Sequence, residues 1–116
     1  MKALFMLNDT PYGSERTYSA LRLATALRAQ DPPATVRIFL RTDAVYCARP
    51  GHNPSQGHSI EKMLRQLADG GAEVEACVTC IESRGLKSLE LIPGVRIGTM
   101  THLAEWVSDS ERVLTF

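Results

Sequence analysis

The N-terminal segment of residues 3–7 is the feature that most constrains the fold. It is a short, unbroken apolar run, Ala-Leu-Phe-Met-Leu, and it ends at a polar turn over residues 8–13. Such a run is typical of a strand that is buried on both faces, as the strands of a parallel sheet are. A helical pattern that Ser14 caps and that runs to about Ala29 follows, and then a β-branched strand at 35–40. The start of the chain therefore predicts two parallel strands joined by a helical crossover.

The rest of the chain repeats this alternation of helix and strand. In chain order, the predicted elements are a helix that Ser59 caps and that Gly70 and Gly71 close, a strand at 72–77, a short helix that ends near Gly85, a turn at 89–94, a strand at 95–98, a helix capped by Thr99 or Thr101, and a strand at 112–116. The predicted apolar faces of the first and last helices are Ala20, Leu23, Ala24 and Leu27, and Met100, Leu103, Ala104 and Val107. We therefore predict a single α/β domain over residues 1–116, with an open, five-stranded, mainly parallel sheet and helices on both faces.

The charge of the chain argues against two classes of partner. Thirteen basic and thirteen acidic side chains give a formal net charge of zero, and no segment gathers lysine and arginine. Proteins that bind nucleic acid or anionic membranes carry basic patches, so we expect neither partner. The 3–7 run is too short for a membrane span or for the core of a signal peptide. We therefore expect a cytoplasmic protein, and we predict no cofactor.

Two of the three cysteines, Cys77 and Cys80, lie close together where the third strand meets a helix. In a reducing compartment such a pair more often serves metal, redox or catalytic chemistry than a structural disulfide. Sites in parallel sheets collect outside the carboxyl ends of the strands, which places this pair near the 8–14 and 41–57 segments. Free N–H groups at the start of the helix lower the pKa of a thiol, and we expect Arg84 to add positive potential.

Three other interpretations of the cysteine pair remain open. The two thiols could be small buried hydrophobes, a common role of free cysteine. They could form half of a zinc site with Cys47 and with His52 or His58 of the 41–58 loop, although that spacing matches no standard zinc finger. They could also form a thioredoxin-like redox pair, although that motif follows the first strand of its unit and this pair follows the third.

The first loop supplies further candidates for binding. Asp9, Tyr12 and Arg16 lie next to a helix N-terminus, and this arrangement could bind a small anion. The same segment is equally consistent with a plain turn, in which Pro11 and Gly13 bend the chain and Arg16 is solvated. Both interpretations are kept as hypotheses.

Four segments of the chain together form a pattern that is fairly specific to one protein family. They are Leu-Asn-Asp-Thr-Pro-Tyr-Gly-Ser-Glu-Arg-Thr at 7–17, Ala-Leu-Arg-Leu-Ala at 20–24, Cys-Val-Thr-Cys-Ile-Glu-Ser-Arg-Gly at 77–85, and the closing segment 100–116. In these segments the chain resembles the DsrE/DsrF-like (DsrEFH-like) family, which includes the sulfur-relay proteins of tRNA thiolation and of dissimilatory sulfur oxidation, and the YchN-like proteins. The resemblance covers nearly the whole chain, and it implies an open five-stranded α/β sheet with flanking helices.

The resemblance also implies a role for each cysteine of the pair. In the active relay members, the cysteine after this strand carries sulfur as a persulfide, and by position that role falls on Cys77. Cys80 is a second thiol that single-cysteine carriers lack, and it could resolve the persulfide or form a disulfide. Arg84 and the loop from Asp9 to Arg16 would shape the surrounding potential. Family members assemble as trimers or hexamers, so we expect a homo-oligomer that exchanges sulfur with donor and acceptor proteins.

Three classes of function follow from these patterns. The first is a sulfur carrier that uses Cys77. The second is a module that binds a small ligand or zinc through Cys77, Cys80 and the 41–58 loop. The third is an oligomeric domain with no chemistry of its own.

Overall fold

Five strands form one sheet in the computed structural model, which describes residues 1–86 and 90–116. They are β1 (Lys2–Leu7), β2 (Thr35–Leu40), β3 (Glu73–Cys77), β4 (Val95–Gly98) and β5 (Arg112–Thr115). Their order across the sheet is β4-β3-β2-β1-β5, and each pairing between these described strands is parallel. The predicted α/β fold with an open sheet is confirmed, and the sheet is parallel throughout its described strands.

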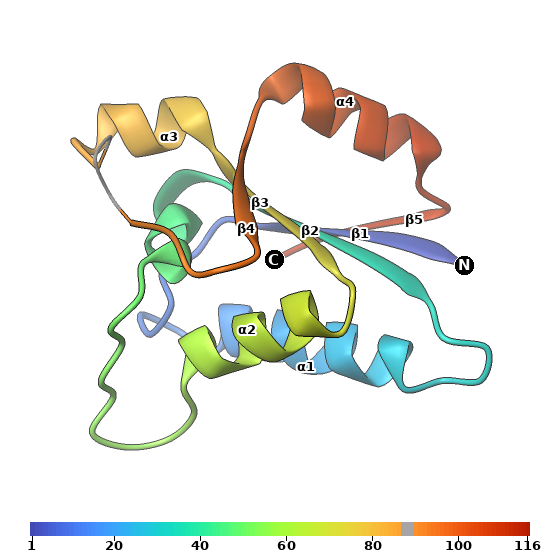
Figure 1. The fold of residues 1–116 in the computed structure, drawn as a ribbon, viewed down its shortest axis with the longest axis horizontal. Coiled ribbons are helices and arrows are strands. Elements are labelled where there is room, and N and C mark those ends of the chain that lie inside the picture. The colour runs from blue at the N-terminus through green and yellow to red at the C-terminus, as the bar shows by residue number, and fades with distance from the viewer. Residues whose placement is uncertain (87–89) are drawn as a thin grey trace.

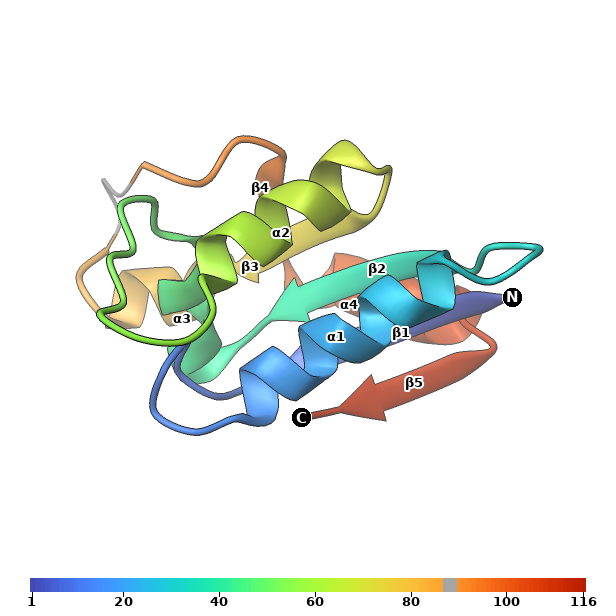
Figure 2. The ribbon, with the colours of Figure 1, turned by 90° about the horizontal axis from the view of Figure 1, so that it is seen from below.

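Helices cover both faces of the sheet, as predicted (Figure 1). α1 (Arg16–Arg28) and α2 (Ile60–Asp69) lie on one face, and Figure 2 shows them side by side. α4 (Met100–Asp109) lies on the other face. The short α3 (Val78–Ser83) continues from the end of β3, and a 3₁₀ helix, η1 (Thr42–Ala48), begins the long segment after β2. None of the helices in the described residues is long and apolar enough to cross a membrane.

The face of the sheet under α1 and α2 is apolar and forms the core. Side chains alternate along a strand, and paired residues of parallel strands point to the same side. The buried residues that share this face are Ala3, Phe5 and Leu7 of β1, Val36, Ile38 and Leu40 of β2, and Val74 and Ala76 of β3. Burial of a large apolar side chain contributes about 1.5–3 kcal/mol. This layer is therefore a main source of the stability of the fold.

The face under α4 is mixed, with Leu4 and Phe39 buried on it, and one arginine connects its elements. Arg37 of β2 pairs with Glu73 of β3 at 3.2 Å and with Asp109 of α4 at 2.9 Å. Its guanidinium carbon also lies 5.5 Å from the centre of the Trp106 ring, and Trp106 packs edge-on against Phe39. Arg37 is mostly buried, so these contacts are better shielded from solvent than surface ion pairs are. They hold α4 against the sheet.

The apolar face predicted for α4 was only partly right. Leu103 is buried as predicted, but Trp106 is buried in place of Met100, Ala104 and Val107, which are exposed. The physical reason is that α4 packs on a mixed sheet face, where the indole ring of Trp106 lies against the Phe39 ring and the Arg37 guanidinium. A pattern of purely aliphatic residues does not reveal such a contact.

The start of α1 also differs from the prediction. Its N-cap is Glu15, one residue after Ser14, whose hydroxyl donates a hydrogen bond to the Asp9 carboxylate and accepts one from the N–H of Arg16 at 3.2 Å. Along the helix, Leu21 is buried and Leu23 is exposed, so the buried face is rotated relative to the predicted one. The loop before the helix thus decides where it begins.

Capping residues mark the starts of α2 and α4 as predicted. The Ser59 hydroxyl accepts a hydrogen bond from the N–H of Lys62 at 3.3 Å, at the start of α2. The Thr99 hydroxyl accepts one from the N–H of His102 at 3.2 Å, at the start of α4. The predicted turn between α3 and β4 begins at Leu89, which lies outside the described residues.

Gly98→Ala tests how tightly the sheet face under α4 is packed beside Cys77. A Cβ atom at Gly98 would lie 2.7 Å from a Glu75 oxygen and 2.7 Å from the Phe39 ring. We expect the substitution to lower the free energy of unfolding by about 1–3 kcal/mol, as other overpacking substitutions do. Urea unfolding measures this change, and Thr101→Ala on the exposed side of α4 is the control. Unchanged stability of Gly98→Ala would contradict the packing described.

Candidate functional site

Cys77 both ends a strand and starts a helix. It is the last residue of β3, where it pairs with Gly98 of β4, and it is the N-cap residue of α3. Its backbone is still extended, with φ −61° and ψ 120°, and the helix begins at the next residue. The predicted strand-to-helix junction is therefore confirmed. Cys77 is only 2% exposed, so its sulfur lies just beneath the surface rather than on it.

The pKa of the Cys77 thiol is lowered although the residue is buried. Burial by itself raises the pKa, because it penalises the thiolate. Hydrogen bonds outweigh this effect: the Thr79 hydroxyl lies 3.2 Å from the sulfur, and the Cys80 thiol donates to it. The N–H groups of Thr79 and Cys80 add to the stabilisation without forming a regular capping hydrogen bond. The residues that follow Cys77 in the sequence therefore favour its thiolate.

The pKa of the Cys80 thiol is shifted in the opposite direction. Burial raises it, and the neighbouring Cys77 raises it further, both through their hydrogen bond and through its negative charge. The N–H of Thr42, 3.2 Å from the Cys80 sulfur, and the charge of Arg84 oppose this rise without cancelling it. The pair is thus unequal: Cys77 favours the thiolate, and the partly exposed Cys80 keeps its proton.

Thr42 is a site residue that sequence analysis missed. Its hydroxyl donates to the carbonyl of Asn8 at 2.5 Å while its N–H donates to Cys80. Its φ of 50° is a left-handed value that a β-branched residue rarely adopts. Strain of this kind costs about 1–3 kcal/mol and persists only where surrounding contacts enforce it. A glycine or asparagine would have signalled such a turn, but a threonine after a strand does not.

Arg84 lies beside the pair but is occupied by other partners. Its Nε atom is 3.0 Å from a carboxylate oxygen of Asp43 in η1, and its guanidinium donates to the carbonyl of Cys80 at 3.2 Å. The predicted positive potential therefore acts on Cys80, whose pKa it lowers slightly. The groups that lower the pKa of Cys77 are Thr79 and Cys80. Arg84 mainly connects the end of α3 to η1.

Cys47 lies in the core and does not complete a metal site. Burial raises the pKa of its thiol to about 12, and its sulfur faces the carbonyl of Asp9 at 4.0 Å. Within residues 1–86 and 90–116, no three histidine, cysteine or acidic side chains gather in a way that could hold a metal ion. The four ligands of the alternative zinc site, Cys47, His52, Cys77 and Cys80, are not gathered into such a group in the described residues.

Asp9 belongs to a turn whose polar groups hydrogen-bond with one another, and Arg16 follows that turn. One Asp9 oxygen accepts the N–H of Thr10 at 2.8 Å, and the other accepts the hydroxyl of Ser14. The bonds from Ser14 and Thr10, and then the charge of Arg16, lower the pKa of Asp9. Arg16 is the exposed first residue of α1. These contacts fit the interpretation of the loop as a plain turn.

Tyr12 ties the first loop to the segment that leads into α2. Its hydroxyl accepts the N–H of Ile60 at 3.1 Å and lies 2.8 Å from Nδ1 of His52. Ile60 is the first residue of α2, where N–H groups have no partner within the helix. The tyrosine therefore supplies an acceptor that the helix end needs, and it fixes the path of the long segment after η1.

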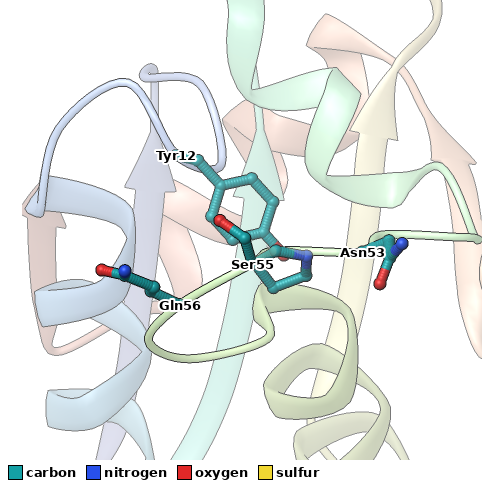
Figure 3. A pocket seen from close by; sticks show the side chains of 5 residues that line it. Tyr12, Asn53, Ser55 and Gln56 are labelled. Atoms are coloured by element: carbon teal, nitrogen blue, oxygen red, sulfur yellow. The ribbon is translucent and has the colours of Figure 1, made fainter.

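Two pockets open beside Tyr12. The first has a volume of about 440 Å³, and Figure 3 shows the Tyr12 ring pointing toward the segment that holds Asn53, Ser55 and Gln56. The second has a volume of about 320 Å³ and includes Tyr18 and His58, whose rings stack with centroids 4.1 Å apart. No cysteine lines either pocket. The pockets and the cysteine pair are separate features of this end of the sheet.

A buried carboxylate lies on the same sheet face as Cys77 and was also missed. Glu75 is two residues before Cys77 in β3, and its side chain is 4% exposed. Its oxygen is 2.8 Å from Nδ1 of His102 in the first turn of α4. A buried carboxylate needs such a partner, so the contact holds α4 against β3. The available signal was the acidic residue at every second position, Glu73 and Glu75, within a strand.

Tyr12→Phe tests the connection between the first loop and α2. The variant leaves the N–H of Ile60 without its acceptor and removes the bond to His52. We expect the free energy of unfolding to fall by about 1 kcal/mol, the usual value of a partly exposed hydrogen bond. Tyr46→Phe removes a hydroxyl outside this network and is the matched control for urea unfolding. Equal stability of the two variants would refute the role given to Tyr12.

Comparisons with known proteins identify the family. The model of the DsrE/DsrF-like family matches residues 1–116. The chain is 43% identical over 115 residues to protein YchN of Escherichia coli (strain K12), which covers 99% of this chain and 98% of that protein. It is 40% identical over 116 residues to the uncharacterized protein MJ0989 of Methanocaldococcus jannaschii, with 100% of both chains covered.

Solved structures agree with the fold. The crystal structure of the ychN protein from E. coli matches with a TM-score of 0.95 and 42% identity, over 100% of this chain and 99% of that one. The protein of unknown function MTH1491 from Methanobacterium thermoautotrophicum shares the fold at a TM-score of 0.80 and 13% identity, over 99% and 98% of the two chains. Because the family model spans the whole chain and a relative at this level of identity covers almost all of it, the chain belongs to the DsrE/DsrF-like family.

Proposed function

We propose that this chain is a sulfur carrier that holds sulfane sulfur as a persulfide on Cys77. The observation that carries the proposal is the lowered pKa of Cys77, whose thiolate is stabilised by Thr79 and Cys80. The thiolate is the form of cysteine that attacks sulfur. Membership of the DsrE/DsrF-like family supports this class of chemistry, because the sulfur-relay proteins named above belong to the same family.

Loading of the carrier is a sulfur exchange that needs no oxidant. The Cys77 thiolate attacks the outer sulfur of a donor persulfide, so a bond forms between these two sulfur atoms. The bond between the outer and inner sulfur of the donor breaks, and its electron pair leaves with the donor thiolate. Attack by an acceptor thiolate on the outer sulfur of the Cys77 persulfide reverses the process. A thiolate that is already stabilised needs no separate general base.

The burial of Cys77 sets a condition for this exchange. At 2% exposure its sulfur is reached by a donor only after the covering atoms move aside. β3 is held through its pairing with Gly98, whereas α3 is a short helix of six residues whose third residue, Cys80, is already partly exposed. Short elements with few contacts open more easily than the centre of a sheet. We therefore place the opening motion in α3.

The same proposal includes partners. We propose that the chain works as a homo-oligomer, a trimer or a hexamer, and that it exchanges sulfur with donor and acceptor proteins. Support comes from large apolar side chains exposed on β4 and α4, namely Ile97 at 51%, Met100 at 60% and Val107 at 41%. Groups of exposed apolar side chains are typical of protein interfaces.

A second candidate function is the binding of a small ligand beside Tyr12. The pockets there, of about 440 and 320 Å³, have the size of small-molecule sites. Their linings come from the first loop, from α1 and from the 53–60 segment. This candidate does not depend on the cysteine pair, because no cysteine lines either pocket.

Two variants that each keep one thiol of the pair test the carrier function. Cys80→Ser retains Cys77 and a hydroxyl that can still donate to it, whereas Cys77→Ser retains Cys80. After incubation of the reduced proteins with a cysteine desulfurase and cysteine, we expect intact mass to show one added sulfur atom on Cys80→Ser and none on Cys77→Ser. Cys47→Ala in the Cys80→Ser background is the control, and it should load equally because the Cys47 thiol, with a pKa of about 12, stays neutral. Loading that does not require Cys77 would contradict the proposal.

A further inference from the structure

The two thiols of the pair are placed so that one can attack the other. Cys77 is the N-cap of α3 and Cys80 is its third residue, a spacing that puts both side chains on the same side of the first turn. A hydrogen bond from the Cys80 thiol is one of the causes that lower the pKa of Cys77. The Cys80 sulfur in turn accepts the N–H of Thr42 at 3.2 Å. Cys80 is thus held beside Cys77 from two elements, by the first turn of α3 and by the N–H of Thr42.

We propose that Cys80 limits the lifetime of the persulfide on Cys77 by attacking its inner sulfur and releasing the outer sulfur as hydrogen sulfide. This inference rests on the proposed carrier function and adds a second outcome to it. A loaded protein either passes its sulfur to an acceptor or discharges it and closes a Cys77–Cys80 disulfide.

The discharge balances without an outside oxidant. A bond forms between the sulfur atoms of Cys80 and Cys77, and the bond between the Cys77 sulfur and the outer sulfur breaks. The electron pair of the broken bond leaves with the outer sulfur, which takes up the proton that Cys80 loses. The outer sulfur is reduced to sulfide, and the two cysteine sulfurs are oxidised to the disulfide. A thiol or dithiol reductant then restores both cysteines.

The environment of Cys80 makes this attack conditional on loading. In the unloaded protein, the Cys77 thiolate receives the Cys80 proton in a hydrogen bond and raises the pKa of Cys80, so Cys80 is a weak nucleophile. In the persulfide, the negative charge moves one atom outward, from the Cys77 sulfur to the outer sulfur. The N–H of Thr42 and the charge of Arg84 remain, and both favour the Cys80 thiolate.

Thr42 is the positioning residue in this arrangement. Its left-handed backbone, with φ 50°, turns its N–H toward Cys80, and its hydroxyl anchors the turn on the carbonyl of Asn8. The strained turn therefore holds the sulfur of Cys80 in place from the end of the neighbouring strand. Spacing within the Cys-x-x-Cys segment alone would leave that sulfur free to rotate.

The test follows the fate of a preloaded persulfide. Reduced wild type, Cys80→Ser and Cys80→Ala are loaded with a cysteine desulfurase and cysteine, freed of donor by rapid desalting, and sampled over time by intact mass and by a colorimetric sulfide assay. We expect wild type to lose the added sulfur, to release one equivalent of sulfide, and to end at the mass of a protein that lacks two hydrogen atoms. In both variants the persulfide should last roughly tenfold longer or more, because an intramolecular nucleophile is missing.

Control variants distinguish failure of the proposed discharge from failure of the carrier function. Cys47→Ala keeps the pair intact and should discharge like wild type, and thermal unfolding checks that each variant is folded. A persulfide that forms on all proteins and decays equally in wild type and in the two Cys80 variants would overturn the discharge and leave the carrier function standing. Failure of Cys80→Ser and Cys80→Ala to load at all would overturn the carrier function, and the discharge with it.

Discussion

The site depends on one junction, at which the residue that ends β3 is also the residue that caps α3. Cys77 is fixed on one side by its parallel pairing with Gly98 and on the other by its N-cap position. A shift of the strand register by one residue would turn the thiol to the opposite face of the sheet. A later helix start would take Thr79 and Cys80 away from the sulfur. The acidity of the thiol is therefore a property of the backbone turn as much as of the side chains.

The two faces of the sheet are stabilised in different ways. In β3, Val74 and Ala76 point into the apolar layer under α1 and α2, and Glu73, Glu75 and Cys77 point to the face that α4 covers. The apolar layer stabilises the fold by burying apolar side chains, and this burial requires no specific partner for each side chain. The layer under α4 combines buried apolar side chains, such as Leu4 and Phe39, with specific ion pairs and hydrogen bonds that hold its elements in definite positions. A thiol placed at the end of that layer has fixed neighbours on one side and a short, more easily opened helix on the other.

Local patterns were sufficient to predict the order of the elements and most of their bounds, because capping residues such as Ser59 and apolar periodicity act over a few residues. They failed where a contact is distant in the sequence. The buried side of α4 follows from Trp106 meeting Arg37 of β2, which no helical pattern contains. The location of the cysteine pair was predictable from the end of a strand, but the hydrogen bond from Thr42 to Cys80 joins two strand ends and depends on an unusual φ. The difference between the two thiols depends on where the fold places their neighbours, because Thr79 and Cys80 lower the pKa of Cys77, whereas the N–H of Thr42 and the charge of Arg84 only oppose the rise in the pKa of Cys80.

The most direct measurement is a titration of the thiolates by their ultraviolet absorbance, in wild type and in Cys77→Ser. A lowered pKa means that the thiolate persists to lower pH than in a free cysteine. The account therefore predicts that the first thiolate of wild type ionises below the ordinary cysteine pKa of about 8.5, and that this ionisation is absent from Cys77→Ser. The remaining thiols should ionise above the ordinary value, with Cys47 last, near its pKa of about 12. A first ionisation at the ordinary value, or one that survives in Cys77→Ser, would contradict the central claim that Cys77 is the activated sulfur.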